Sequence, residues 1–145
     1  MKIFIGSDHA GYSLKEALKK HLELIGHEIE DKGAFSHDTD DDYPDFVKPV
    51  AEAVAADEDS LGVVLGGSGQ GEAICANRVK GIRAAVYYGG NIEIVKLSRE
   101  HNNSNILSLG ARFITGEEAS AALDLWINTS FEGGRHTRRI EKLDD

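Results

Sequence analysis

The sequence predicts a three-layer α/β fold of the Rossmann-like, flavodoxin-like kind: a five-stranded parallel sheet between helices, plus a C-terminal helix. Short apolar runs alternate with amphipathic stretches along the whole chain, as in parallel strands joined by crossover helices. Glycine is frequent (16 residues) and proline is scarce (2 residues), which suits tight turns between regular elements. With right-handed crossovers, five such strands favour the order 2-1-3-4-5.

The composition narrows the class of protein. A chain of 145 residues is expected to form a single domain, residues 1–145. The net charge of −9 argues against nucleic acid as a partner, because phosphate backbones need a basic surface. A single cysteine allows no internal disulfide and fits a reducing compartment. No apolar run approaches the roughly 20 residues of a membrane span, and no signal peptide is visible, so a cytoplasmic protein is expected.

The first elements follow from the apolar pattern. A strand at residues 3–5 leads into a polar, glycine-flanked turn that contains Asp8 and His9. Ser13 is the expected N-cap of a helix, and Gly26 is expected to end it. A second, short strand follows at residues 27–31.

A polar loop at residues 33–43 comes next and contains four aspartates. This acidic run lacks the ligand spacing of a calcium-binding EF-hand, so a solvated loop is the better interpretation. Tyr43 and Pro44 then begin a helix that ends at the charged segment 57–59. The third strand is expected at residues 61–65.

The third strand enters a glycine-rich turn, Gly66-Gly67-Ser68-Gly69-Gln70-Gly71, and a helix begins near Glu72. Glycines let a ligand approach the bare main chain, and unpaired N–H groups at a helix start favour an anion. The alternative is an ordinary tight turn with an acidic residue at the helix start. Dinucleotide binding is disfavoured, because that motif belongs to the first strand and this loop lies in mid-chain.

The remaining elements are expected as a fourth strand at 82–88, a helix at 91–99, a fifth strand at 105–109, a helix capped by Thr115, and a last charged helix at 135–143. Two loops carry most of the reactive side chains: the one with Asp8 and His9, and the glycine-rich one. In the expected strand order these loops meet where the winding of the sheet reverses, and ligands bind there. Asp8 could instead serve only its own turn.

Two more groups stand out. Arg135 and Arg139 share a helix face and could clamp a phosphate, or could form a solvated basic helix. His101, at a helix end, is by itself more typical of a structural role. Cys75 lies among small residues of a helix and is interpreted as a buried apolar group rather than a nucleophile.

Five motifs together resemble ribose-5-phosphate isomerase B and its sugar-phosphate isomerase relatives: segments 6–11, 67–72, 76–84, 99–103 and 133–136. The resemblance spans nearly the whole chain in the right order. It implies interconversion of ribose 5-phosphate and ribulose 5-phosphate through an enediolate, a step of the pentose phosphate pathway, without metal or cofactor. The family's base is often a cysteine, which would align with Gly66. This chain is similar to the subgroup whose base is a glutamate, at Glu72.

The resemblance also implies roles for other residues. His101, with Asp8 as a possible partner, would open the sugar ring, and the Ser68 hydroxyl with the loop amides would hold the enediolate. The other expected substrate contacts are Asp8, His9, Tyr43, Gly67, Gly69, Gln70, Gly71, Asn102, Arg112, Arg135 and Arg139.

The expected strands place His101 and Glu72 apart. His101 precedes the fifth strand, at the amino edge of the sheet, whereas Glu72 follows the third strand, at the carboxyl edge. A five-residue strand spans about 17 Å, so one chain cannot bring both to one substrate. We therefore expect a homodimer, or a dimer of dimers, with shared active sites.

Two alternatives remain at this stage. The substrate could be a hexose 6-phosphate, such as allose or galactose 6-phosphate, because pocket depth decides this and the sequence does not show it. The chain could also be a non-catalytic nucleotide- or flavin-binding module on the same fold. A carboxylate beside the phosphate loop, at Glu72, favours an enzyme over a simple phosphate binder.

Overall fold

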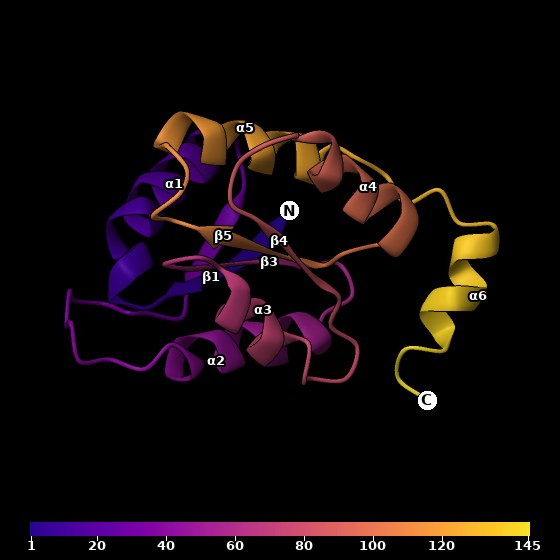
Figure 1. Cartoon of the computed structure of the whole chain (residues 1–145), viewed down its shortest axis with the longest axis horizontal. Coiled ribbons are helices and arrows are strands. Elements are labelled where there is room, and N and C mark those ends of the chain that lie inside the picture. Colours follow the sequence, from indigo (N-terminus) through magenta and orange to yellow (C-terminus); the bar gives the residue numbers. More distant parts are fainter.

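The computed structural model describes all 145 residues and has a parallel sheet with helices on both faces (Figure 1). Every strand pair in the sheet is parallel, so the predicted α/β class is confirmed. The strands are β1 (Lys2–Ser7), β2 (Glu28–Asp31), β3 (Leu61–Gly66), β4 (Ala84–Tyr87) and β5 (Ile106–Gly110).

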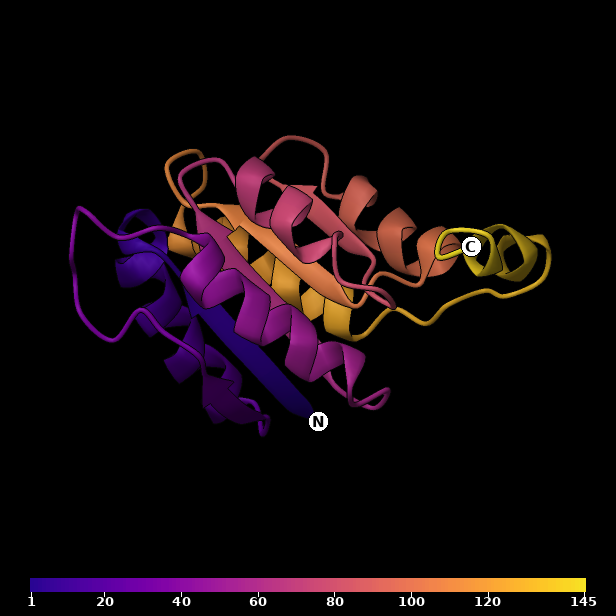
Figure 2. The ribbon, with the colours of Figure 1, turned by 90° about the horizontal axis from the view of Figure 1, so that it is seen from below.

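Two helical layers cover the sheet (Figures 1 and 2). One face carries α1 (Tyr12–Leu24), α4 (Glu93–Asn102) and α5 (Gly116–Ile127), and the other carries α2 (Pro44–Ala55) and α3 (Gln70–Ala76). Each layer buries its own apolar cluster against the strands. This division follows from the right-handed crossover rule, because each reversal of winding direction moves the connecting helix to the opposite face.

The predicted order of the last two strands is wrong. The sheet runs β2-β1-β3-β5-β4, so β5 is inserted between β3 and β4. All five residues of β5 are buried, whereas three of the four residues of β4 are only partly buried. The bulkier apolar run therefore takes the central position and the alanine-containing strand takes the edge. The predicted neighbours β1 and β3 do pair.

The predicted starts and N-caps of the helices are partly right and partly wrong. Ser13 is not an N-cap: α1 begins at Tyr12, after a short 3-10 helix (His9–Gly11) whose N-cap is Asp8. The helix after the glycine-rich loop starts at Gln70, which places Glu72 in its first turn. Thr115 caps α5 as predicted, in a capping box with Glu118.

The last helix, α6 (Arg135–Glu141), stands at one end of the molecule and packs against α4 (Figure 1). The segment leading to it is tied to α4 by a hydrogen bond from the Glu132 N–H to the Glu100 carbonyl, 3.0 Å. None of the helices is both long and apolar enough to cross a bilayer.

Candidate active site

The loops after β1, β3 and β5 meet at the carboxyl edge of the sheet. Ser7 pairs with Leu65, and Gly66 pairs with Gly110, so these strands end side by side. The insertion of β5 brings a third loop to the site, because the Arg112 N–H donates to the Gly67 carbonyl over 3.1 Å. The two loops expected to meet therefore do so, and the corrected strand order adds Arg112.

Glu72 is the buried acid of this edge. It lies in the first turn of α3 and is 4% exposed. Its carboxylate lies directly against Gly66: a Cβ atom at Gly66 would stand 1.8 Å from Oε1 and 2.1 Å from Cδ of Glu72. Burial raises the pKa of Glu72, a contact with its own backbone N–H opposes this, and the charge of Asp8 raises the pKa further.

The glycine-rich loop leaves hydrogen-bond donors free beside this carboxylate. The amides of Gly67, Ser68 and Gly69 donate to no acceptor within the chain. Gly69 has a φ of +82°, a left-handed conformation that glycine adopts without strain. The buried Ser108 hydroxyl fixes the turn by donating to the Gly69 carbonyl, 2.6 Å. The loop thus forms a cradle, a concave set of unpaired N–H groups fixed in place by Ser108, and this arrangement binds anions.

Asp8 and His9 lie in the loop after β1, at the same carboxyl edge of the sheet. Asp8 accepts from the amides of Ala10 and Gly11, at 3.0 and 3.4 Å, so it serves its own turn as the alternative interpretation expected. The His9 ring Nδ1 lies 2.7 Å from Oδ1 of Asp41. This hydrogen bond is the main reason that the pKa of His9 is raised, although desolvation opposes it.

Asp41 is a residue that sequence reasoning missed. The acidic run was interpreted as a solvated loop, and its other members Asp38, Asp40 and Asp42 are exposed. The Asp41 side chain is instead only 8% exposed and also accepts from the His9 backbone N–H, 3.2 Å. No spacing in the loop distinguishes Asp41 from its neighbours, because the distinction comes from a contact 32 residues away along the chain.

Tyr43 and Arg112 flank the glycine-rich loop. A Cβ atom at Gly71 would stand 2.9 Å from the Tyr43 hydroxyl, and one at Gly67 would stand 3.1 Å from the Arg112 guanidinium. Gln70 is exposed at the start of α3. Arg112 and His9 are close enough for the guanidinium to act on the His9 pKa, which it lowers. Two basic groups therefore lie beside the cradle of free amides.

The structure does not bring His101 to this site. His101 lies in the last turn of α4, with Asn102, just before β5 begins. Ile106 pairs with Gly62 and Gly110 with Gly66, so β5 climbs from the amino edge to the carboxyl edge over about 13 Å. Arg135 and Arg139 lie with His101 on the α6 side, both exposed. The predicted site residues thus form two separate groups within one chain.

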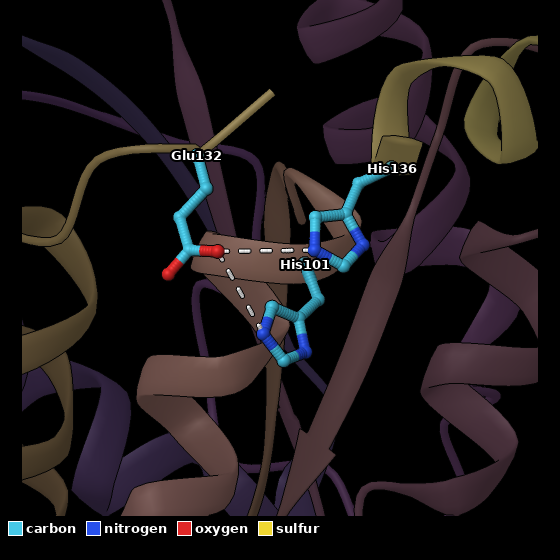
Figure 3. A group of neighbouring side chains, drawn as sticks. All are labelled: His101, Glu132 and His136. Atoms are coloured by element: carbon cyan, nitrogen blue, oxygen red, sulfur yellow. Dashed lines mark ion pairs between the residues drawn. The ribbon is translucent and has the colours of Figure 1, made fainter. Parts of the chain in front are cut away.

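The second group contains two residues to which the sequence assigned no role: Glu132, and His136 of the motif 133–136. The Glu132 carboxylate lies 3.9 Å from Nε2 of His101 and 3.8 Å from Nε2 of His136 (Figure 3). The two imidazole rings stack, with centroids 4.4 Å apart. His136 directly follows Arg135 in the chain, and only the packing of α6 on α4 pairs it with His101.

The largest cavity, about 640 Å³, lies elsewhere. Arg83 and Arg99 line it together with Met1 and the acidic segment 57–59. It contains none of the predicted site residues. Glu72, Asp8 and His9 line none of the cavities of the chain.

Comparison with known proteins assigns the chain to a family. Residues 3–143 match the family model described as Ribose/Galactose Isomerase. The chain belongs to this family. A family member from Mycolicibacterium paratuberculosis, named ribose-5-phosphate isomerase B, is 48% identical over 144 residues, covering 99% of this chain and 89% of its own. A Bacillus subtilis member, named as a putative sugar phosphate isomerase, is 39% identical, covering 100% and 96%.

Solved structures of family members share the fold. Ribose-5-phosphate isomerase B from Clostridium thermocellum superposes with a TM-score of 0.94 at 46% identity, covering 99% of this chain and 95% of its own. The enzyme from Mycoplasma genitalium, solved with bound ribulose-5-phosphate, gives a TM-score of 0.93 at 40% identity, covering 98% and 93%. The resemblance drawn from the sequence motifs is confirmed at the level of the family.

Proposed function

We propose that this chain is an aldose–ketose isomerase that interconverts ribose 5-phosphate and ribulose 5-phosphate. Family membership, relatives named ribose-5-phosphate isomerase B and a relative holding ribulose-5-phosphate support the proposal. The observation that carries it in this chain is the Glu72 carboxylate, buried against Gly66 beside three free amides. This pairs a base with an oxyanion cradle, as proton transfer next to a carbonyl requires.

Glu72 acts as the general base. It takes the proton from C2 of the open-chain aldose, and the electron pair of that bond moves toward C1 and its oxygen to form the enediolate. The same carboxyl group returns the proton to C1 while the proton of the C2 hydroxyl passes to the C1 oxygen, which leaves the carbonyl at C2 and gives the ketose. Burial raises the pKa of Glu72, and a carboxylate whose pKa lies nearer to neutrality is a stronger base. Cys75, in the same helix, is a buried thiol whose pKa burial raises, so it is a poor nucleophile.

The loop of residues 67–71 holds the charge that develops on the sugar oxygens. The free amides of Gly67, Ser68 and Gly69 donate to it, and the Ser68 hydroxyl adds a side-chain donor. Loss of one donor of this kind typically costs roughly 10²–10³ in rate. Gln70 and Gly71 continue the loop into α3, and Tyr43 packs over Gly71, which closes one wall around the sugar.

The phosphate is held by the basic groups. His9 has a raised pKa because of Asp41, so its imidazolium form persists toward neutral pH and attracts a phosphate dianion. The Arg112 guanidinium lies beside Gly67 and offers bidentate donors. Asp8 positions this turn through its amide contacts.

The ring-opening group comes from a second copy of the chain. His101 and Asn102 lie at the amino edge, with Arg135 and Arg139 nearby, whereas Glu72 lies at the carboxyl edge. We propose a homodimer, or a dimer of dimers, in which the partner's His101 group faces the Glu72 group. In this arrangement His101 exchanges the protons that open the furanose, Asn102 contacts the sugar, and the two arginines complete the phosphate site.

The decisive experiment assays the purified chain with ribose 5-phosphate, allose 6-phosphate and galactose 6-phosphate, because the family description also names galactose. We expect ribose 5-phosphate to give the highest kcat/KM. Glu72→Gln is expected to lower kcat by at least about 10²-fold, the low end for a general base. Cys75→Ser, one helical turn away, is the matched control and is expected to retain activity.

The outcomes separate the alternatives. A higher kcat/KM with a hexose 6-phosphate would reassign the substrate while keeping the chemistry. If turnover persisted in Glu72→Gln but was lost in Cys75→Ser, the Cys75 thiol would be the general base instead of Glu72. If the chain isomerised no sugar phosphate and showed the visible absorbance of a bound flavin, we would conclude that it is a non-catalytic binding module.

A further inference from the structure

The cluster of His101, Glu132 and His136 joins α6 to the end of α4. The three side chains come from the last turn of α4, the connecting segment and the first turn of α6, and both imidazole rings lie beside the Glu132 carboxylate (Figure 3). One carboxylate oxygen of Glu132 faces both Nε2 atoms, at 3.9 and 3.8 Å. The three ligand atoms all lie within 4.8 Å of one another.

The Nε2 atom of His136 is the unused group of this cluster. Both carboxylate–imidazole distances exceed the range of a hydrogen bond. The His136 side chain is 9% exposed, and its buried Nε2 atom has no hydrogen-bond partner. A buried polar atom without a partner is costly, so its orientation toward Glu132 and His101 points to a ligand between them.

A second carboxylate–histidine group in the chain uses its histidine differently. Asp8, His9 and Asp41 also bring three ligand atoms together. There, Asp8 already accepts from two backbone amides, and Nδ1 of His9 is bonded to Oδ1 of Asp41 at 2.7 Å. The unpartnered atom of that group is a carboxylate oxygen, Oδ2 of Asp41, whereas in the His101–Glu132–His136 group it is an imidazole nitrogen.

We propose that His101, Glu132 and His136 form a binding site for a divalent transition-metal ion of the Zn²⁺ class. Two imidazoles and a carboxylate are a ligand set that Zn²⁺ takes in proteins, with the fourth position open to water. Metal–ligand bonds of about 2.0–2.2 Å place tetrahedral ligand atoms roughly 3.3–3.5 Å apart. The two observed distances need to close by only about half an ångström.

Two features set the strength of the site. The rings are 15° from parallel, so the half-exposed His101 ring must tilt out of the stack before both lone pairs meet one ion. Arg135, adjacent to the cluster, repels a cation.

Metal binding has two consequences for the molecule. It ties α6 to α4, because the ligands come from both helices. It also occupies Nε2 of His101, and this second consequence rests on the proposed function, in which His101 opens the sugar ring. The ion therefore acts as a reversible inhibitor of an enzyme whose chemistry uses no metal.

The test titrates the full-length, metal-free chain with Zn²⁺ against a chromophoric chelator, and with Co²⁺ while following its visible d–d absorption. Glu132→Gln is the main variant, since the Glu132 side chain is 52% exposed and its change does not disturb a core. His136→Asn is the second variant. His21→Gln is the matched control, because His21 pairs with Asp124 at 2.8 Å without a third ligand.

We expect one ion per chain, tetrahedral Co²⁺ absorption, and binding at least about tenfold weaker in both variants but unchanged in the control, a loss typical of a disturbed site. Zn²⁺ should also inhibit isomerisation of ribose 5-phosphate by the wild type. A chelator should relieve this inhibition. Equal binding by wild type and Glu132→Gln, or no binding by the wild type, overturns the site. Normal metal binding without any isomerase activity contradicts the proposed function instead.

Discussion

The carboxylate of Glu72 lies in the space that a side chain at position 66 would occupy. A Cβ atom there would be 1.8 Å from Oε1 and 2.5 Å from Oε2 of Glu72. Since no atom can be accommodated at such distances, a side chain at position 66 and the present placement of Glu72 exclude each other. The absence of a side chain at Gly66 is therefore a condition for the observed position of the Glu72 carboxylate.

Gly66→Ala tests this relationship. The added methyl group must push the carboxylate out of its place, and a displacement of about 1 Å at a reacting group can cost 10²-fold in rate. We expect kcat for ribose 5-phosphate to fall by at least that factor while circular dichroism shows an intact fold. Gly116→Ala is the control, because a Cβ atom there meets nothing within 4 Å. A fully active Gly66→Ala would show that Glu72 works from another position.

Glu72→Gln is expected to stabilise the protein while it lowers kcat. The folded-state pKa of Glu72 is raised above the ordinary 4.5, so the folded chain binds its proton more tightly than the unfolded chain. That contribution to stability is present below pH 4.5 and is lost as the pH rises through the folded pKa. At pH 7 the buried charge therefore destabilises the wild type, and the neutral amide does not.

The measurement is the Tm of both proteins between pH 4 and pH 8. The Tm advantage of Glu72→Gln should be clear at pH 7 and should shrink toward pH 4. Glu52→Gln, an exposed change on α2, should show neither effect. A variant less stable than the wild type at pH 7 would mean that the charge is better solvated than its burial indicates.

Asp41→Asn is expected to weaken phosphate binding at neutral pH. The Asp41 carboxylate, bonded to the His9 ring at 2.7 Å, is the largest cause of the raised His9 pKa. Without it, His9 should lose its proton nearer to pH 6.5, so KM should rise severalfold at pH 7.5 and change little at pH 5.5, with kcat nearly constant. Asp42→Asn, exposed in the same loop, is the control. A pH-independent change in KM would instead indicate a disturbed loop.

A mixing experiment tests whether active sites are shared between subunits. Glu72→Gln and His101→Asn are each expected to be inactive. If each site takes Glu72 from one chain and His101 from another, half of the randomly mixed dimers have one intact site, and activity should return to about a quarter of wild type. Mixing Glu72→Gln with Gly66→Ala, which damage the same half-site, should restore nothing. If neither mixture regained activity, each active site would instead be complete within one chain.

Much of the candidate site follows from local sequence. The glycine-rich turn after an apolar strand predicted an anion cradle, and the predicted pairing of β1 with β3 correctly placed Asp8 and His9 beside it. These inferences rest on short-range geometry, since a parallel strand ends in a loop at a known edge of the sheet. The family resemblance rested on the same short motifs.

Local sequence patterns specify the alternation of strands and helices, the two reactive loops and the acid beside the glycines. Only long-range packing places β5 between β3 and β4, bonds Asp41 to His9 while its neighbours stay solvated, and stacks His136 on His101. These contacts join residues 32 and 35 positions apart in the chain, or depend on which apolar strand is buried at the centre. Periodicity and spacing report only on neighbours within a few residues, whereas long-range packing is settled by competition among all the apolar surfaces at once.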